Sequence, residues 1–388
     1  SAFIECTLAQ IYKDRTPDGK FIGGQAYYAE KGLGWKWYGT MIAVVSIVSG
    51  ILGSPCVQSN VIAESVSTAL NVPMWTVGLA VTIVLAAVIF GGIQRIADAA
   101  SKIVPVMCIV YLLISIVLIA ANISKLPGVI GLIFSSAFDP KSMFGGMIGT
   151  AVVWGMRRGI YSNEAGQGTG TAAAAAVDAD HPIEQGLVQA LSVFIDTLGV
   201  CSISAFCILI TGCYNVSGPD GALLVENLPN VPDGIAYVQY AISSLIPFGQ
   251  YIIAFLITTF AFTSLMSYYL EGEVAFIYIT DKHTKKYRNL AITILRTIFL
   301  ALVFVSSSWP SYRVWNVTDI GGGLLTWAHL ALIVIISRPA IKALRDYDKQ
   351  RKAGISSPVF DPVALNIKNA ELWTEINKEK GRERSNID

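Results

Sequence analysis

Residues 100–122 read ASKIVPVMCIVYLLISIVLIAAN and contain a single charged side chain, that of Lys102. A helix needs about 20 apolar residues to cross about 30 Å of hydrocarbon, so this stretch predicts a membrane-spanning helix. Seven other segments have the same character, at roughly 38–70, 74–92, 127–156, 184–212, 236–270, 292–309 and 314–338. We therefore predict an all-α polytopic membrane protein with about eight membrane spans.

The composition agrees with a lipid environment and excludes several classes of protein. Of the 388 residues, 53% are hydrophobic and 14% are charged, whereas a soluble protein usually carries about 25% charged residues. The net charge of +1 excludes a basic nucleic-acid-binding protein. The cysteines form no CxxC pair and the histidines lie far apart, so we expect no metal site of the His/Cys type.

The basic residues predict the sidedness of the chain, because short cytoplasmic loops are rich in Lys and Arg. Most of them fall on alternate sides of successive spans, in 13–37, 91–102, Arg157 with Arg158, 282–288 and 338–384. These segments are expected to share the cytoplasmic side. The loop 13–37 and the polar tail 341–388 are then cytoplasmic, and 38–340 forms the membrane domain.

The chain opens with SAFIECTLAQIY, and residues 1–12 read like the end of a membrane helix. This beginning has no initiator Met and no basic start followed by an apolar run and a cleavage site, which a signal peptide would show. We expect an N-terminally truncated fragment.

The first candidate site is SMFGGMIGTAVVWG, residues 142–155. Glycines weaken a helix within an apolar stretch, and a broken membrane helix offers free backbone groups to substrates and ions. Phe144, Met147 and Ile148 could wall a small pocket beside Gly145 and Gly146. Close packing of helices through small residues is the alternative.

The second candidate is RRGIYSNEAGQGTGTAAAAA, residues 157–176, in which Ser162, Asn163 and Glu164 supply a cap and polar ligands. Arg157 and Arg158 place its start at the cytoplasmic surface, which favours a capped gate or re-entrant loop over direct substrate contact. Its glycines do not match a phosphate-binding loop, so nothing supports transport driven by ATP.

The third candidate is FAFTSLMSYYLEGE, residues 260–273. The hydroxyls of Thr263 and Ser264 and the carbonyl of Phe260 form an all-oxygen set suited to sodium. Alternatively, the hydroxyls only bond back to a carbonyl one turn earlier. Asp196 and Glu64 are acids in or near spans and are therefore candidates for a functional site. Asp319, in WNVTDIGGG, marks another flexible break.

Several motifs form a specific set: GGQAYYAEKGLG (23–34), VQSNVIAESV (57–66), IFSSAFDP (133–140), RRGIYSNEAGQG (157–168), DHPIEQGLVQALSVFIDT (180–197), FAFTSL (260–265) and VWNVTD (314–319). Together they resemble the sodium:alanine/glycine symporters, the amino-acid carrier:cation symporter family. The resemblance runs from residue 1 to about 340.

The resemblance implies a leucine-transporter-like inverted-repeat fold of two five-helix repeats, the second beginning near residue 127. It implies that the substrate pocket is lined by Phe144, Gly145, Gly146, Met147, Ile148, Tyr268 and Gln58. It implies a sodium site at Phe260, Thr263 and Ser264. A gating or structural motif is assigned to Ser162, Asn163, Glu164, Gly166 and Asp196. Family members begin with a broken first repeat helix that precedes residue 1 here, so we expect that the fragment does not transport by itself.

The predicted function is secondary active transport: sodium-coupled symport of alanine or glycine by alternating access, in a bacterial or archaeal cytoplasmic membrane. The partners are a small neutral amino acid, the sodium ion and the lipid bilayer. We expect no cofactor other than sodium as the coupling ion, and no enzymatic activity, because the polar residues form no pair of nucleophile and base. An amino-acid-sensing or channel-like membrane protein on the same scaffold is the alternative.

Overall fold

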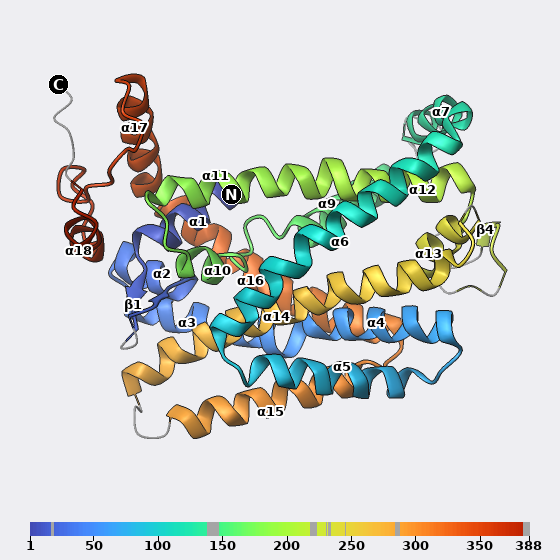
Figure 1. The fold of residues 1–388 in the computed structure, drawn as a ribbon, viewed down its shortest axis with the longest axis horizontal. Coiled ribbons are helices and arrows are strands. Elements are labelled where there is room, and N and C mark those ends of the chain that lie inside the picture. The colour runs from blue at the N-terminus through green and yellow to red at the C-terminus, as the bar shows by residue number, and fades with distance from the viewer. Residues whose placement is uncertain are drawn as a thin grey trace.

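The computed structural model shows an elongated bundle of long helices, with short helices and hairpins at its two ends (Figure 1). It describes residues 1–16, 19–137, 147–217, 223–229, 231, 234–244, 246–283 and 288–382. The helices are α1 (Ala2–Ile11), α2 (Gln25–Leu33), α3 (Lys36–Ile47), α4 (Pro55–Leu70), α5 (Met74–Ile89), α6 (Ile93–Ala121), α7 (Leu126–Ala137), α9 (Met147–Asn163), α10 (Thr171–Ala176), α11 (Pro182–Phe194), α12 (Ser202–Thr211), α13 (Ile235–Ser243), α14 (Gly249–His283), α15 (Arg288–Ser306), α16 (Ser311–Ile335), α17 (Arg338–Lys352) and α18 (Leu372–Glu379).

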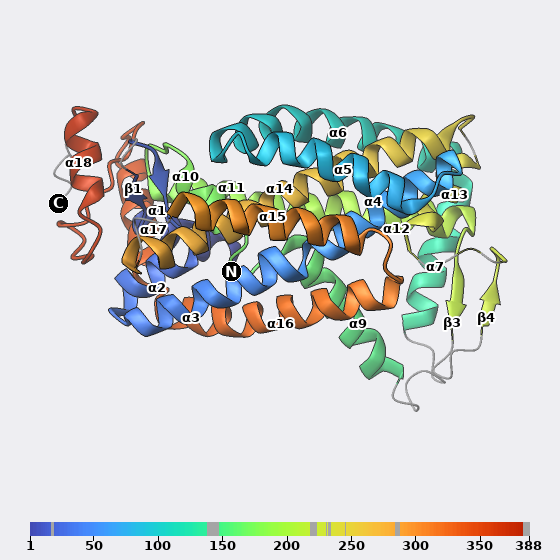
Figure 2. The same cartoon turned by 90° about the horizontal axis from the view of Figure 1, so that it is seen from below.

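Two small antiparallel hairpins and three irregular helical turns complete the described fold. The first hairpin pairs β1 (Asp14–Arg15) with β2 (Phe21–Ile22), and the second pairs β3 (Asn215–Ser217) with β4 (Leu223–Glu226). The irregular turns are η1 (Val48–Gly53), η2 (Ile123–Lys125) and η3 (Ile195–Cys201). The two hairpins lie at opposite ends of the bundle (Figures 1 and 2).

Six helical stretches of the described chain are long and apolar enough to cross a membrane, which confirms a polytopic membrane protein. They are Lys36–Leu70, Ala99–Ala121, Pro182–Thr211, Gly249–Thr280, Arg288–Ser306 and Ser311–Ile335. The predicted segment 74–92 corresponds to the shorter apolar helix α5. The predicted segment 127–156 contains the separate helices α7 and α9.

The predicted segment 236–270 is longer than one span requires, and in the structure it is divided, because α13 ends at Ser243 and α14 begins only at Gly249. Pro247 has no backbone N–H to continue a helix, and Phe248 takes a left-handed conformation with φ of 63°. A Cβ on Gly249 would lie 2.9 Å from the Cα of Ser243, so glycine permits this tight corner.

A π-helical turn in the long helix Lys36–Leu70 brings this helix close to its neighbours. The turn, η1, ends just before Pro55, which cannot donate the next backbone hydrogen bond. A Cβ on Gly50 would lie 3.0 Å from the carbonyl oxygen of Tyr268 in α14. Thr318 of α16 donates a hydrogen bond of 3.0 Å to the carbonyl of Gly53. The turn therefore joins α14 and α16 at the middle of the bundle.

The apolar core lies between these helices, and many apolar side chains face outward. Ile62, Leu85, Leu265 and Phe299 are fully buried where α4, α5, α14 and α15 meet. Large apolar residues on the outer faces are exposed, among them Leu113, Val117, Leu191, Phe255 and Val334. An apolar exterior over long helices is the surface expected against lipid.

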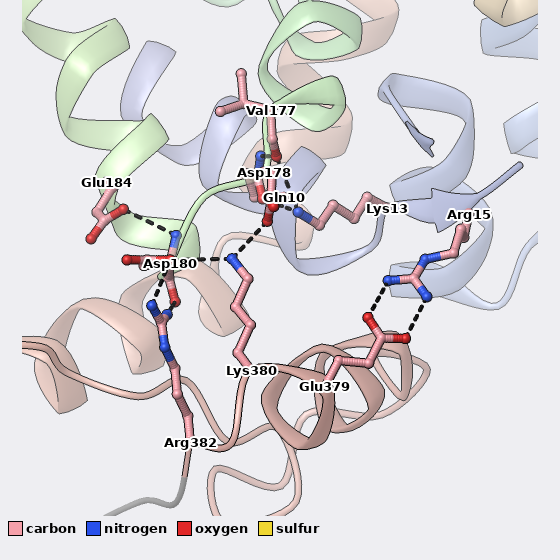
Figure 3. Close-up of polar contacts among 10 residues, drawn as sticks. All are labelled: Gln10, Lys13, Arg15, Val177, Asp178, Asp180, Glu184, Glu379, Lys380 and Arg382. Atoms are coloured by element: carbon pink, nitrogen blue, oxygen red, sulfur yellow. Dashed lines mark hydrogen bonds and ion pairs between the residues drawn. The ribbon is translucent and has the colours of Figure 1, made fainter. Parts of the chain in front are cut away.

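The C-terminal tail packs against one end of the bundle through α17 and α18 (Figure 2). Trp373 is fully buried, and its indole Nε1 donates a hydrogen bond of 2.8 Å to the carbonyl of Gln10. Phe360 is also fully buried beside it, with the two ring centroids 5.5 Å apart. Charged residues surround these anchors: Arg15 pairs with Glu379, and Lys380 and Arg382 pair with Asp180 (Figure 3).

Candidate functional site

A cavity of about 340 Å³ lies in the middle of the bundle, and we call it the central cavity. It is bounded by Ser54 at the N-cap of α4, by the end of α9 and the segment that follows it, and by α14 and α16. Its lining is rich in polar groups: Ser54, Arg157, Ile160, Tyr161, Glu164, Gln167, Tyr268, Thr318, Asp319, Gly322, Gly323, Thr326 and Trp327. The structure therefore brings together Glu164, Tyr268 and Asp319, which belong to three separate candidate regions of the sequence.

Glu164 connects the second and third candidate regions. The Tyr268 hydroxyl donates to its Oε1 atom, and the Thr169 hydroxyl donates to its Oε2 atom. Glu164 has φ of 52°, so the chain turns sharply as it leaves α9. This turn directs the carboxylate at α14. Glu164 of the predicted gating motif and Tyr268 of the predicted substrate pocket are thus in direct contact.

The neighbouring Ser162 and Asn163 bond to a different element, the π-helical turn η3. The Ser162 hydroxyl donates to Oδ2 of Asp196 at 2.6 Å, and the Asn163 amide donates to the Thr197 hydroxyl at 3.1 Å. A π-turn displaces side chains from their regular helical positions and often marks a functional place. Ser162, Asn163 and Asp196 therefore form one contact between α9 and the α11–α12 helix.

Arg157 and Arg158 both lie within α9 and are partly exposed, and Arg158 donates to the two carboxylate oxygens of Asp319 at 3.1 Å each. Their predicted place at the cytoplasmic surface stays a prediction. Arg157 lies 3.6 Å from the same carboxylate, and the ring of Trp315 is 4.3 Å from the Arg158 guanidinium. Asp319 supplies a countercharge inside a candidate membrane span, which holds the arginines beside α16.

The three predicted sodium ligands lie within one turn of α14. The hydroxyls of Thr263 and Ser264 both donate to the Phe260 carbonyl oxygen, at 2.7 and 3.2 Å. This is the local bonding that single hydroxyls adopt in membrane helices, and it also gathers three oxygens. Ser264 and Tyr268 are four residues apart and share a helix face. The oxygen set therefore lies one turn from the central cavity.

The remaining predicted pocket residues have a weaker connection to the cavity. The Gln58 amide donates to the Tyr161 hydroxyl at 3.4 Å, so Gln58 reaches the cavity through Tyr161. Phe144, Gly145 and Gly146 lie outside the described residues. Met147 and Ile148 are the first residues of α9. The first candidate site thus remains a prediction.

Sequence reasoning missed a second polar cluster around Gly166. The Glu5 carboxylate accepts hydrogen bonds from the backbone N–H groups of Gly166 and Gly168, at 3.2 and 3.1 Å. The His329 Nδ1 atom lies 2.7 Å from the Gly166 carbonyl oxygen, and the Tyr28 hydroxyl bonds the other ring nitrogen. A single acid in an apolar helix, Glu5 in SAFIECTL, is the signal that could have pointed to this cluster.

A larger cavity of about 630 Å³ lies near the tail, between residues of β1, α2 and α14 and the tail residues Asn369 and Glu371. It contains none of the predicted site residues. Among the described residues, no group of three or more His, Cys, Asp or Glu side chains is placed to hold a metal ion. The central cavity is therefore the better candidate.

Comparison with known proteins identifies the family of the chain. Residues 1–362 match the model of the sodium:alanine symporter family. A putative sodium/proton-dependent alanine carrier protein of Bacillus subtilis, YrbD, is 46% identical over 374 residues, which cover 96% of this chain and 76% of the relative. A sodium/proton-dependent alanine carrier protein of Bacillus sp. PS3 is 39% identical, covering 96% of this chain and 83% of the relative.

Another relative, GlnT of Bacillus subtilis, is named a probable sodium/glutamine symporter. It is 36% identical over 374 residues, which cover 96% of this chain and 74% of the relative. The matched family agrees with the resemblance carried by the sequence motifs, and residues of two of these motifs line the central cavity. The chain belongs to the sodium:alanine symporter family.

Proposed function

We propose that the protein takes up a small neutral amino acid, alanine or glycine, by sodium-coupled symport with alternating access. The family and the names of the relatives support sodium-coupled amino acid transport. The observation that carries the proposal is the central cavity itself, in which Glu164 and Tyr268 meet one helical turn from the oxygens of Phe260, Thr263 and Ser264.

The cavity has the size and the chemistry for a small zwitterion. Ligand sites commonly begin at about 300 Å³, and the cavity measures about 340 Å³. The carboxylates of Glu164 and Asp319 are acceptors for an ammonium group, and Arg157 is a donor for a carboxylate. The Tyr268 ring and Ile160 supply an apolar wall for a short side chain. We propose that Phe144, Gly145, Gly146, Met147 and Ile148 complete this pocket and that Gln58 supports it.

The proposed sodium ligands explain how the ion and the substrate cooperate. Sodium bound by Phe260, Thr263 and Ser264 would hold the segment of α14 that presents Tyr268 to the cavity. Ordering of this segment by the ion lowers the cost of ordering it for the substrate, so each ligand favours the other. Ser162, Asn163, Glu164, Gly166 and Asp196 serve as the gate that closes over the pocket.

The proposed architecture is the inverted-repeat fold of the leucine-transporter type, with the second repeat beginning near residue 127. The loop 13–37 and the tail 341–388 are proposed to be cytoplasmic. The positive charges of the chain support this sidedness, because β1, α2 and the basic helix α17 lie at the same end of the bundle (Figure 1).

The first test is uptake of labelled alanine into proteoliposomes that contain the full-length protein, with an inward sodium gradient and a potassium gradient as the control. Sodium-dependent accumulation above equilibrium supports symport, whereas equilibration without accumulation contradicts it and favours a channel. Competition by unlabelled alanine, glycine and glutamine then ranks the substrates. Glycine and alanine differ by one methyl group, which changes binding by about 1–3 kcal/mol in a pocket.

The sodium ligands are tested with the double variant Thr263→Ala, Ser264→Ala. We expect the sodium concentration for half-maximal uptake to rise about tenfold, which corresponds to about 1.4 kcal/mol of binding free energy. Thr280→Ala is the matched control, because its hydroxyl bonds back to Phe276 in the same helix, away from the proposed ligands. Unchanged sodium dependence of the double variant would reject these ligands.

A further inference from the structure

A second, very small cavity lies where α2, α3, α10 and α14 meet, near the end of the bundle that carries the tail (Figure 1). Its volume is about 10 Å³, close to the space that one water molecule needs. Gln25 of α2, Ser46 of α3 and Glu271 of α14 line it, together with Thr171 at the start of α10. We call it the inner cavity.

Three residues that line the inner cavity carry polar atoms without a hydrogen-bond partner. Among the described residues, no partner is found for Glu271 Oε2, Gln25 Oε1 or Ser46 Oγ. The exposed fractions of these residues are 3%, 4% and 1%. Most buried polar atoms in proteins are paired, because an unpaired one costs about 1–3 kcal/mol. Three such atoms around one small space indicate a bound partner.

The chemistry of the three atoms indicates a cation. The amide oxygen of Gln25 and an ionised carboxylate oxygen of Glu271 can only accept, so they require a donor or a positive charge. The other oxygen of Glu271 accepts a hydrogen bond of 2.9 Å from the Gln25 amide nitrogen, which fixes both groups at the cavity.

A comparison with Glu273, two residues along α14, strengthens this conclusion. Both acids are 3% exposed, and among the described residues each has one carboxylate oxygen without a hydrogen-bond partner. Glu273 pairs with Arg296 at 2.9 Å. Across the described residues, Glu271 forms no salt bridge to a Lys, Arg or His side chain. A buried carboxylate without a basic partner is costly unless it takes up a proton or a bound cation neutralises it. The chain therefore supplies a base for Glu273 and, among the described residues, none for Glu271.

The ligand set points to a monovalent ion. All three unpaired atoms are oxygens, which suit a hard cation, and the cavity lining contains no thiol or imidazole for a transition metal. One carboxylate balances a single positive charge. Resting on the proposed sodium-coupled transport, we propose that Glu271, Gln25 and Ser46 bind a sodium ion at a second site, separate from Phe260, Thr263 and Ser264. Thr263 and Glu271 are two turns apart in α14, which is about 12 Å along a helix axis.

The site connects ion binding to the segment that follows Glu164. A Cβ on Gly168 would lie 2.6 Å from the Gln25 amide carbon, so the amide packs directly against this glycine. A Cβ on Gly50 would lie 3.4 Å from Glu271 Oε2, which places the turn η1 on the other side of the carboxylate. A sodium ion at this point holds α2, α3 and α14 together and stabilises the packing of this end of the bundle.

The test counts bound sodium and compares variants. Purified protein is equilibrated with radioactive sodium in choline chloride, with saturating alanine, and the ions bound per protein are measured. We expect Glu271→Gln to bind one sodium ion fewer than the parent protein. Ser46→Ala is expected to weaken one of the two binding steps about tenfold and leaves the charges unchanged. Glu273→Gln, the matched control, is expected to bind as many ions as the parent.

Each outcome decides the proposal. The site is rejected if Glu271→Gln binds as many sodium ions as the parent; if that variant also loses the pH dependence of uptake, Glu271 is a proton carrier instead. If Glu271→Gln does not fold, Ser46→Ala decides, because unchanged sodium affinity rejects the site. If the unmutated protein binds no sodium, the proposed sodium-coupled transport is contradicted. If it binds one sodium ion, and the double variant Thr263→Ala, Ser264→Ala binds none, sodium-coupled transport is supported and the second site is rejected.

Discussion

The docked tail and the interior of the bundle differ in the partners of their acidic side chains. At the tail, acids and bases face each other directly: Arg15 and Glu379 are 2.6 Å apart, and Lys380 lies 2.7 Å from Asp178 (Figure 3). In the interior, Glu164 is held by two hydroxyls, and Glu271 is held by one amide. The tail pairs are partly exposed to water, whereas Glu271 is buried and Glu164 is partly buried at the central cavity.

The difference follows from the cost of removing charge from water. Paired and hydrated charges at a surface contribute little free energy and mainly select a geometry. A carboxylate inside the bundle must be neutralised, by a base as in Glu273 with Arg296, by a proton or by a bound cation. Interior acids without a base are therefore the places where an ion can couple to the conformation of a transporter, and the tail charges are expected to position α18.

The largest expected effect tests whether apolar burial, rather than charge, holds the tail. In Trp373→Ala, a fully buried indole and its hydrogen bond to Gln10 are lost. We expect tail docking to weaken by about 3–5 kcal/mol. Limited proteolysis of the segment between α17 and α18 measures it, with the exposed Val363→Ala as the control. Equal cleavage rates in the two variants would show that the charges hold the tail.

A smaller effect is expected for Glu164→Ala in the interior. The hydroxyls of Tyr268 and Thr169 lose the carboxylate that accepts from both of them, and we expect this loss to cost about 1–3 kcal/mol in total. Thermal unfolding in detergent should show a lower melting temperature, and sodium-dependent alanine uptake should fall. Glu164→Gln, which keeps one acceptor oxygen, should recover part of both. A variant with unchanged melting and uptake would remove Glu164 from the site.

The buried Lys13 predicts a pH dependence of tail docking. Its Nζ atom donates to Gln10 Oε1 at 2.8 Å and lies 4.7 Å from the Trp373 ring, and burial lowers the pKa of Lys13 to about 7. An undocked lysine keeps a pKa near 10.5, so between these values the undocked state binds more protons. Docking should therefore strengthen as the pH rises from about 7 toward 10.

Proteolysis of the tail at several pH values measures this dependence. Lys13→Met keeps an apolar side chain of similar length and cannot titrate, so its tail should be cleaved at a rate that does not change with pH once protease activity is corrected. A parent protein whose cleavage accelerates between pH 7 and 10 would show that Lys13 stays charged under the tail.

The smallest effect is expected for Glu379→Ala, the surface counterpart of Glu164→Ala. The ion pair with Arg15 is open to water on both sides, so its loss should change tail cleavage only slightly and only at low salt. The measurement is the same proteolysis at low and high sodium chloride concentration. If Glu379→Ala weakens tail docking as much as Trp373→Ala does, or if its effect persists at high salt, surface ion pairs contribute more to docking than we expect.

Hydropathy predicts elements well when the information is local. The spans around 100–122, 184–212, 292–309 and 314–338 each coincide with a long apolar helix, because a lipid environment requires a continuous apolar stretch. The same reasoning joins 236–270 into one apolar segment, because hydropathy stays high where the chain turns between α13 and α14. Pro247 and Phe248 interrupt the helix there without interrupting the apolar run.

The candidate site also contains residues that local sequence can group and a contact that it cannot predict. Phe260, Thr263 and Ser264 can be grouped from sequence, since one helical turn brings them together and the structure places both hydroxyls on the Phe260 carbonyl. Asp319 is predicted from sequence to mark a flexible break, which is wrong, because α16 is helical from Ser311 to Ile335. Its partner, Arg158, has the sequence signature of a surface residue instead, because positive charges beside a span usually indicate cytoplasm.

The sequence by itself determined that this chain is a helical membrane protein and a sodium:alanine symporter relative, because apolar length and local motifs are written in consecutive residues. Only the tertiary structure decided which acids lack a base. Gln25 and Glu271 are 246 positions apart, and Glu271 and Glu273 look alike in the sequence. Whether a buried charge is paired depends on which helices meet, and that is set by packing.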